Sequence, residues 1–312
     1  MTVRVGLVGA RGHTGRELLR LIAGRDDMEL VFASSREFAG KPVADMAPEV
    51  SNGLGFEALS PADVASREVD AVILALPNGA AAGFVKAIDD AGRDPVIVDL
   101  SADYRFDDSW VYGMPEVYGR ETLASARRIS NPGCYATAGQ MAIAPVRERL
   151  GAPAHVFGVS GYSGAGTTPS RKNDLAALRD NLMPYAIAGH IHEREMSRHL
   201  GVEVQFTPHV AAFFRGIVAT VHLGFAEAIT GEELRRAFAD FYAGEALVEL
   251  ADGIPEIIDG AGKPGITIGG FQLADDGRRA VIVSTLDNLL KGAAVQAMQN
   301  LTLAVGLPEE RG

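Results

Sequence analysis

The chain has 312 residues, 47% of them hydrophobic and 22% charged, which is typical of a globular protein long enough for two domains. Its formal net charge of −11 argues against general binding to nucleic acids or to membrane surfaces. The single cysteine cannot form an intramolecular disulfide, an apolar strand pattern starts at Val3 and leaves no room for a signal peptide, and no apolar run is as long as a membrane span. We therefore expect a cytoplasmic protein.

The first third of the chain alternates short apolar runs with helical patterns. We expect strands at residues 3–8, 29–33, 71–75 and 95–99, and helices at 17–23 and 80–91. Strands and helices that alternate at this spacing predict an α/β domain with a doubly wound parallel sheet of the Rossmann type.

The pattern changes in the second part of the chain. We expect a helix at 134–150 that is kinked at Pro145, a second helix at 231–242, and strands at 156–160, 202–207, 216–225 and 280–284. This order predicts an α+β domain with an antiparallel or mixed sheet. The last helical pattern, 291–303, is expected to return to the first domain, so the predicted domains are 1–133 with 291–312, and 134–290.

A glycine-rich turn follows the first predicted strand. It reads G-x-x-G-x-x-G, and the residues we expect to bind a dinucleotide are Gly9, Arg11, Gly12, His13, Thr14 and Gly15. Glycines at a strand-to-helix turn let the backbone approach a pyrophosphate, and the helix N-terminus faces the phosphates. The alternative is a tight turn that binds nothing.

The end of the second predicted strand distinguishes between the two nicotinamide cofactors. An acidic residue there would bind the ribose 2′-hydroxyl of NAD, whereas this chain has Ser34, Ser35 and Arg36. Hydroxyls and a guanidinium suit a 2′-phosphate, so we expect NADP, although Glu37 lies close by.

The only cysteine, Cys134, follows Pro132 and Gly133 at the predicted start of a helix. Amides at a helix N-terminus stabilise a thiolate and make the cysteine a better nucleophile. A lone cysteine can also be a small buried hydrophobic residue, but the flanking glycine and proline favour a reactive position.

A nucleophile needs an acid/base partner, and the segment His190-Ile191-His192-Glu193-Arg194-Glu195 is the densest ionisable cluster in the chain. Each histidine alone could be an ordinary surface or core residue. The H-x-H pair could also bind a metal together with Cys134, but the chain has no clear metal-ligand spacing, so we expect no metal.

These motifs together resemble the N-acetyl-γ-glutamyl-phosphate reductases of arginine biosynthesis over nearly the whole chain. The resemblance rests on a series of motifs in the family's order: Gly9 to Leu18, Ala75 to Gly79, Asp99 to Phe106, Tyr112 to Glu116, Asn131 to Thr137, Ser160 to Gly166, Thr207 to His209, Arg215-Gly216 and Asp287 to Ala294. One position departs from it, because the family commonly has proline where this chain has Arg194.

The resemblance implies a glyceraldehyde-3-phosphate-dehydrogenase-like fold and an NADPH-dependent oxidoreductase that converts N-acetyl-L-glutamyl 5-phosphate to the 5-semialdehyde and phosphate. Cys134 would form a thioester, and His190, as the imidazolium, would protonate the intermediate. It also implies further cofactor contacts at Leu76, Pro77, Ser163, Gly164 and Asn288, and a homo-oligomer, dimeric or tetrameric.

The substrate has two anionic groups, which need cationic partners. We expect Arg105 and Arg215 to bind them, with Arg171 and Lys172 as weaker candidates. His192 and Glu195 are assigned as further substrate contacts, although the order of roles between His190 and His192 stays open.

Four other functions are consistent with part of the pattern. The first is a lysine-pathway reductase of an N-blocked aminoadipyl phosphate, whose substrate is one methylene longer. The second is an aspartate-semialdehyde dehydrogenase, which the segments at 160–166 and 190–195 argue against. The others are an inactive NADP-binding sensor and a Cys–His hydrolase, which would have no use for the dinucleotide turn.

Overall fold

The computed structural model describes residues 2–309, and its strands form two seven-stranded sheets in two compact units. One unit holds the described residues up to Gly133 and those from Ala293 on; the other is Cys134–Gly292. The outer ends of the predicted first domain, residue 1 and residues 310–312, lie outside the described residues.

The sheet of the first unit is parallel throughout and has the order β3-β2-β1-β4-β5-β7-β6. Its elements are β1 Val3–Val8, α1 His13–Ala23, β2 Met28–Ser34, η1 Val43–Asp45, β3 Phe56–Glu57, α2 Pro61–Ser66, β4 Ala71–Leu74, α3 Ala82–Asp90, β5 Val96–Asp99, β6 Val111–Tyr112, α4 Pro115–Tyr118, α5 Glu121–Ala124, β7 Arg128–Ser130 and α11 Val295–Ala304. The predicted doubly wound parallel sheet is therefore confirmed.

Two hydrophobic clusters cover the two faces of this sheet. One contains apolar residues of α1 and α11, including Leu18 and Leu301, and the other contains residues of α2 and α3, including Val64 and Ile88. The strand order reverses between β1 and β4, and ligands of open parallel sheets bind at the carboxyl ends of the strands at such a reversal. The glycine-rich turn follows β1 at this edge.

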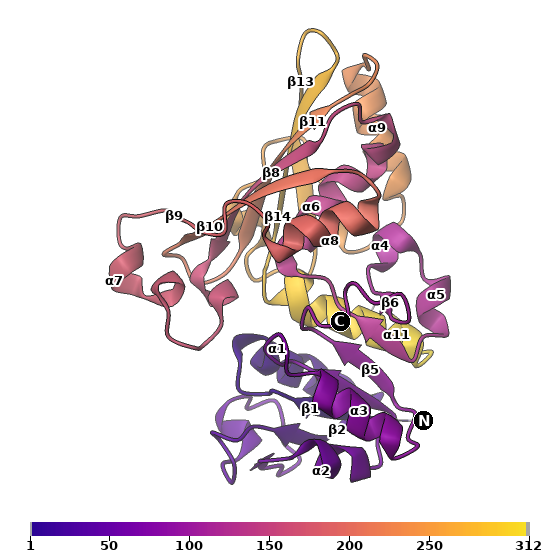
Figure 1. Ribbon diagram of the computed structural model, residues 1–312, viewed down its shortest axis with the longest axis vertical. Helices are drawn as coiled ribbons and strands as arrows, with labels where there is room; N and C mark the ends of the chain where they lie inside the picture. The colour runs from indigo at the N-terminus through magenta and orange to yellow at the C-terminus, as the bar shows by residue number, and fades with distance from the viewer. Residues whose placement is uncertain (1, 310–312) are drawn as a thin grey trace. The chain divides into compact units, whose positions relative to one another are not determined.

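The second unit has a mixed sheet with the order β12-β13-β14-β11-β8-β10-β9. Its elements are α6 Cys134–Ile143, η2 Ala144–Arg149, β8 Ala154–Gly161, η3 Tyr162–Ala165, η4 Arg171–Asn173, α7 Leu175–Leu178, β9 Met183–Pro184, α8 Ile191–Leu200, β10 Val204–Ala211, β11 Ile217–Gly224, α9 Gly231–Phe241, β12 Val248–Leu250, α10 Ile257–Gly260, β13 Ile266–Leu273 and β14 Arg279–Leu286. The helices α6, α8 and α9 lie along this sheet, as Figure 1 shows. The predicted mixed sheet is also confirmed.

Two predicted helices differ from the observed ones in instructive ways. The helix from Cys134 stays α-helical only to Ile143 and continues as the 3₁₀ turns of η2, because Pro145 has no backbone N–H to donate. The last helix begins with a π-helical segment, η5 Leu290–Ala294, before α11. Among residues 2–309, no helix is long and apolar enough to span a membrane.

Two glycines of the glycine-rich turn have different surroundings. A Cβ at Gly15 would lie 2.6 Å from the backbone oxygen of Ala10, whereas a Cβ at Gly12 would meet no atom within 4 Å. Gly15 is therefore required by the packing of the turn itself. Gly12 has extended backbone as the N-cap of α1, so the fold of the chain does not require a glycine there.

We predict that Gly15→Ala destabilises the chain by about 1–3 kcal/mol, because the backbone of Ala10 has to move away from the added methyl group. The matched variant Gly12→Ala should change stability by less than about 1 kcal/mol. Chemical denaturation followed by circular dichroism measures both. Equal stability of the two variants would contradict this account of the turn.

Candidate active site

Cys134 is the first residue of α6, and its side chain is half-buried. The rest of α6 is buried, so the helix is fixed on all sides. A Cβ at Gly292 would lie 2.8 Å from the Cβ of Cys134, so the backbone of η5 approaches the cysteine closely and only glycine fits there. The predicted position of the thiol at a helix N-terminus is confirmed.

Two tyrosines lie beside the cysteine. The hydroxyl of Tyr135 donates to the backbone oxygen of His209 at 2.5 Å, and Tyr185 lies close enough to Tyr135 and Cys134 for their charges to act on its phenol. Burial, followed by the nearby charge of the Cys134 thiolate, raises the pKa of Tyr185 well above its ordinary value. Both phenols are therefore neutral groups next to the thiol at physiological pH.

His190 lies in the same cluster, at the start of α8. It is the N-cap of this helix, and its Nδ1 accepts a hydrogen bond of 3.1 Å from the backbone N–H of His192. The edge of its ring meets Tyr185, with centroids 5.7 Å apart, and the His192 ring lies 4.7 Å away. Burial, and after it the charge of Lys172, lowers the pKa of His190.

The two glutamates of this segment have different partners. The carboxylate of Glu193 accepts from the backbone amides of Gly189 and Phe206, at 3.1 and 2.9 Å. Glu195 is fully buried, and its Oε2 lies 4.0 Å from Nε2 of His192. Glu193 thus joins the backbone just before His190 to β10, while Glu195 lies against His192.

Arg215 is held by a buried carboxylate. Its Nε lies 2.9 Å from Oδ2 of Asp287, and the Arg215 side chain keeps 24% of its surface exposed. The same carboxylate accepts from the backbone amides of Gly262, Leu289 and Leu290. The guanidinium is therefore oriented by a rigid anion while part of it faces solvent.

Asn288 connects three loops of the second unit. Its Nδ2 donates to the hydroxyl of Ser163 at 2.9 Å, and its Oδ1 accepts from the amide of Gly216 at 2.8 Å. A Cβ at Gly164 would lie 3.0 Å from the hydroxyl of Ser160. The predicted cofactor residues Ser163, Gly164 and Asn288 thus lie together, next to Arg215.

The predicted dinucleotide residues of the first unit surround the turn after β1. Gly9 has a φ of +86°, and a Cβ there would lie 2.2 Å from the oxygen of Ala75. The amides of Gly9 and Ala10 both donate to the backbone oxygen of Ser34, which joins the turn to the end of β2. His13 and Thr14 are the first two residues of α1 and are partly exposed.

The residues expected to determine selectivity for NADP over NAD differ in solvent exposure. Ser34 and Ser35 are buried, and Arg36 is exposed. Arg11 forms an ion pair with Glu37, so the acidic residue near this site has a cationic partner.

Leu76 and Pro77 belong to a turn that is joined to the loop after β5. The carboxylate of Asp103 accepts from the amides of Gly79 and Ala81, and the side chain of Asn78 accepts in return from Ala102. This reciprocal pair of contacts fixes the turn, in which Leu76 is partly buried and Pro77 exposed.

Arg105 is buried, with 7% of its surface exposed. Its Nε donates to the backbone oxygen of Asn131 at 2.9 Å, and its Nη2 donates to that of Leu100 at 2.8 Å. The guanidinium therefore fixes the segment that leads to Pro132. Its predicted contact with a substrate anion stays a prediction.

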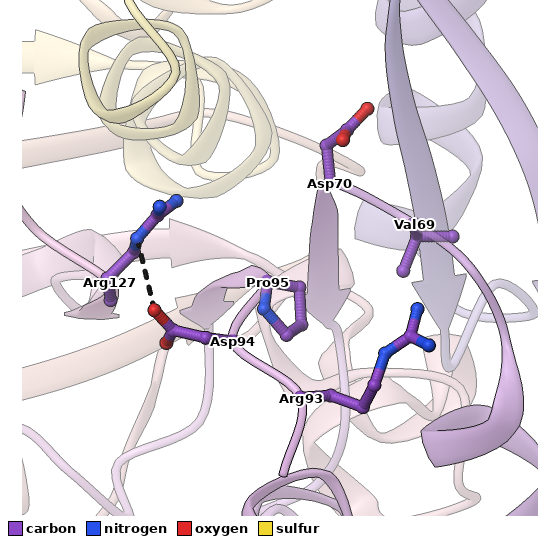
Figure 2. Close-up of a pocket in the computed structure, with 6 residues that line it drawn as sticks. All are labelled: Val69, Asp70, Arg93, Asp94, Pro95 and Arg127. Atoms are coloured by element: carbon purple, nitrogen blue, oxygen red, sulfur yellow. Dashed lines mark ion pairs between the residues drawn. The ribbon is translucent and has the colours of Figure 1, made fainter.

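A polar pocket of about 290 Å³ lies at the opposite edge of the parallel sheet (Figure 2). Asp70, Pro95 and Arg127 directly precede β4, β5 and β7, so the pocket is at the amino ends of these strands. Arg127 pairs with Asp94, and Asp70 accepts from the amide of Arg4. Ligands of parallel sheets bind at the carboxyl ends, so we do not assign the active site to this pocket.

Sequence reasoning missed four residues of this arrangement: Tyr185, Glu193, Asp287 and Gly292. Tyr185 gave no spacing signal, and Glu193 lay within the ionisable cluster without an assigned role, because the roles of both depend on contacts between distant segments. Asp287 and Gly292 lay within a motif that carried the family resemblance, but no role could be assigned to either. In the described part of the chain, no three His, Cys, Asp or Glu side chains form a group that could hold a metal ion.

Comparisons with known proteins match each of the two units to a protein family. Residues 4–126 match the family "Semialdehyde dehydrogenase, NAD binding domain", and residues 134–288 match "Semialdehyde dehydrogenase, dimerisation domain". An N-acetyl-gamma-glutamyl-phosphate reductase from Xanthomonas campestris pv. campestris is 55% identical over 99% of this chain and 98% of its own.

Solved structures show the same fold at low sequence identity. Aspartate semialdehyde dehydrogenase II from Vibrio cholerae matches with a TM-score of 0.79 at 20% identity, covering 98% of this chain and 99% of its own. Aspartate semialdehyde dehydrogenase with NADP from Candida albicans matches with a TM-score of 0.77 at 15% identity, covering 97% and 98%.

We predict that Gly292→Ala changes the rate at which iodoacetamide alkylates Cys134, because the new methyl group displaces the cysteine from the start of α6. The signal is unambiguous, since the chain has one cysteine. Gly253→Ala is the control, because a Cβ there meets no atom within 4 Å. Identical alkylation rates in the wild type and the Gly292 variant would contradict the close approach.

Proposed function

The chain belongs to the N-acetyl-γ-glutamyl-phosphate reductase family, and from that premise we propose that it converts N-acetyl-L-glutamyl 5-phosphate and NADPH to N-acetyl-L-glutamate 5-semialdehyde, NADP⁺ and phosphate in arginine biosynthesis. The observation that carries the proposal is the 55% identity to a reductase of that name over nearly both full lengths. The lone cysteine at the start of α6 supports it independently, since this chemistry needs an acyl-accepting thiolate.

We assign the first chemical step to Cys134. Its thiolate attacks the acyl carbon, the bond from sulfur to carbon forms, and the bond from carbon to the phosphate oxygen breaks. The amides at the start of α6 stabilise the thiolate, and the neutral phenols of Tyr135 and Tyr185 add no competing charge beside it. When it is bound, the nicotinamide supplies the hydride that reduces the thioester to the aldehyde.

The pyrophosphate and the 2′-phosphate of the cofactor are assigned to the first unit. The open space at Gly12 lets a pyrophosphate approach the backbone, and Gly9 gives the turn its tight geometry. Ser34, Ser35 and Arg36 favour NADPH over NADH, and the ion pair of Glu37 with Arg11 removes an unpaired negative charge from this place. The remaining cofactor contacts we propose are Arg11, His13, Thr14, Gly15, Leu76, Pro77, Ser163, Gly164 and Asn288.

We assign the second unit to catalysis and assembly. His190 is the polar partner of Cys134, and Arg215, His192 and Glu195 are the proposed substrate contacts of this unit. Arg105, a residue of the first unit, is a further proposed substrate contact. The match to a dimerisation domain supports a homo-oligomer. A catalytic thiol also suits the reducing cytoplasm.

We predict that Cys134→Ser abolishes reduction of the acyl phosphate and leaves NADPH binding close to that of the wild type. Serine at this position is a far weaker nucleophile, because its hydroxyl stays protonated. Steady-state kinetics and fluorescence titration with NADPH measure the two effects. Near-normal turnover of the acyl phosphate by the variant would contradict the proposed mechanism. If the wild-type protein binds NADPH but never reduces the acyl phosphate, the result would favour an inactive NADP-binding sensor.

The cofactor assignment predicts a selective effect of Arg36→Ala. The variant should raise KM for NADPH about tenfold or more and leave KM for NADH nearly unchanged, because one charge-assisted hydrogen bond to the 2′-phosphate contributes about 1.5–3 kcal/mol. Arg20→Ala is the control, since Arg20 is on the same unit and pairs with Glu49. An equal rise in KM for NADPH and for NADH would contradict the assignment of Arg36 to the 2′-phosphate.

A further inference from the structure

An ion pair joins the glycine-rich turn to the segment that follows β2. Arg11 of the turn extends its guanidinium to the carboxylate of Glu37, and the two side chains keep 40% and 56% of their surface exposed. The backbone brings the same two segments together, because the amides of Gly9 and Ala10 both donate to the oxygen of Ser34. The ion pair therefore spans the two segments to which the cofactor phosphates are assigned.

The backbone that carries Glu37 is held in a tight turn. Ser35 is buried, and its hydroxyl accepts a hydrogen bond of 3.2 Å from the amide of Phe38. The ring of Phe38 packs against that of Phe56 at the start of β3, with centroids 5.7 Å apart. Glu37 lies inside this turn, so the fold of the first unit sets the position of its backbone beside the end of β2.

Glu37 follows the second strand, where a dinucleotide-binding domain selects between NAD and NADP. An acidic residue there accepts a hydrogen bond from the ribose 2′-hydroxyl of NAD, whereas a cationic residue binds the 2′-phosphate of NADP. A phosphate monoester carries a charge of about −1.5 to −2 at pH 7, so an unpaired carboxylate beside it repels it. Glu37 by itself would thus favour NADH.

We propose that Arg11 determines cofactor selectivity by neutralising Glu37, so that a carboxylate at this position becomes compatible with the 2′-phosphate of NADPH. The ion pair acts together with Arg36, the residue assigned to the 2′-phosphate above. The inference rests on the proposed function for the place of the cofactor, and on the observed ion pair for the role of Arg11.

A second carboxylate near the end of β2 is paired as well. Glu57 on β3 is the strand neighbour of Ser34, and its carboxylate forms an ion pair with Arg67. Arg67 is the C-cap of α2, whereas Arg11 belongs to the turn and precedes Gly12, where a Cβ would meet no atom within 4 Å. Of the two cations, Arg11 is therefore the one beside the open space assigned to the pyrophosphate.

Fluorescence titrations with NADPH and with NADH, in the absence of the acyl phosphate, test the proposal. Arg11→Ala should weaken NADPH binding about tenfold or more and leave NADH binding equal or tighter, because the uncovered carboxylate repels the 2′-phosphate and accepts from the 2′-hydroxyl. An exposed ion pair contributes little to folding stability, so the variant should fold, and retained NADH binding confirms that it has. Equal weakening of both cofactors would overturn the proposal.

A double-mutant cycle tests whether Arg11 acts through Glu37. Glu37→Gln alone should bind NADPH as tightly as the wild type or more tightly, since no carboxylate remains to be neutralised. Combined with Arg11→Ala, it should bind NADPH at least about threefold more tightly than Arg11→Ala alone, because the repelling charge is gone. No such recovery in the double variant would overturn the proposal.

The matched control is the ion pair of Arg20 with Glu49 on the same unit. Its Nε lies 3.0 Å from Oε1, and its side chains are 49% and 42% exposed, close to the values for Arg11 and Glu37. Arg20→Ala and Glu49→Gln should change the ratio of the two dissociation constants less than about twofold, since solvent and salt screen distant charges. A change as large as that of Arg11→Ala would trace the effect to net charge and overturn the proposal.

These titrations separate the inference from the proposed function, because they measure binding without turnover. A chain that shows the predicted selectivity but never reduces the acyl phosphate contradicts the proposed function and supports the role of Arg11. A chain that reduces the acyl phosphate, and whose Arg11→Ala variant keeps the wild-type preference for NADPH over NADH, does the reverse.

Discussion

The candidate site of the second unit depends on glycines that let neighbouring segments pack closely against α6. No side chain other than hydrogen fits at Gly292 beside Cys134, and a Cβ at Gly158 on β8 would lie 2.6 Å from the ring of Tyr135. Further along α6, a Cβ at Gly139 would lie 2.4 Å from the sulfur of Met196 on α8, so a glycine is required there as well. These contacts bring η5, β8 and α8 to α6, and with α8 comes His190.

Fixed hydrogen bonds then define the chemistry of this cluster. The backbone before α8 is held by Glu193, the ring of His190 by the amide of His192, and Arg215 by Asp287. In each case the orienting partner is a carboxylate or a backbone amide, and neither kind of group takes part in the proposed chemical step. Such pre-oriented groups need no reorganisation when charge develops at the reacting carbon.

The sequence predicted the elements whose signal is local. The first strand was predicted at 3–8 and is found there, and Cys134 begins a helix as expected. The helix α8 was missed, because its N-cap is a histidine rather than Ser, Thr, Asp or Asn, and its charged sequence shows little apolar periodicity. The strand β13 was missed because Gly269 and Gly270 interrupt its pattern, at the place where the pairing with β14 shifts register.

The parts of the site that could not be predicted are contacts between distant segments. No local pattern indicates that Tyr185 meets both Tyr135 and His190, or that Asp287 orients Arg215. The most direct test of the account is mass spectrometry of the protein mixed with N-acetyl-L-glutamyl 5-phosphate in the absence of NADPH. The account predicts one acyl group bound as a thioester on the peptide that contains Cys134, and removal of this group when NADPH is added. An unmodified Cys134 under conditions in which the enzyme turns over would contradict it.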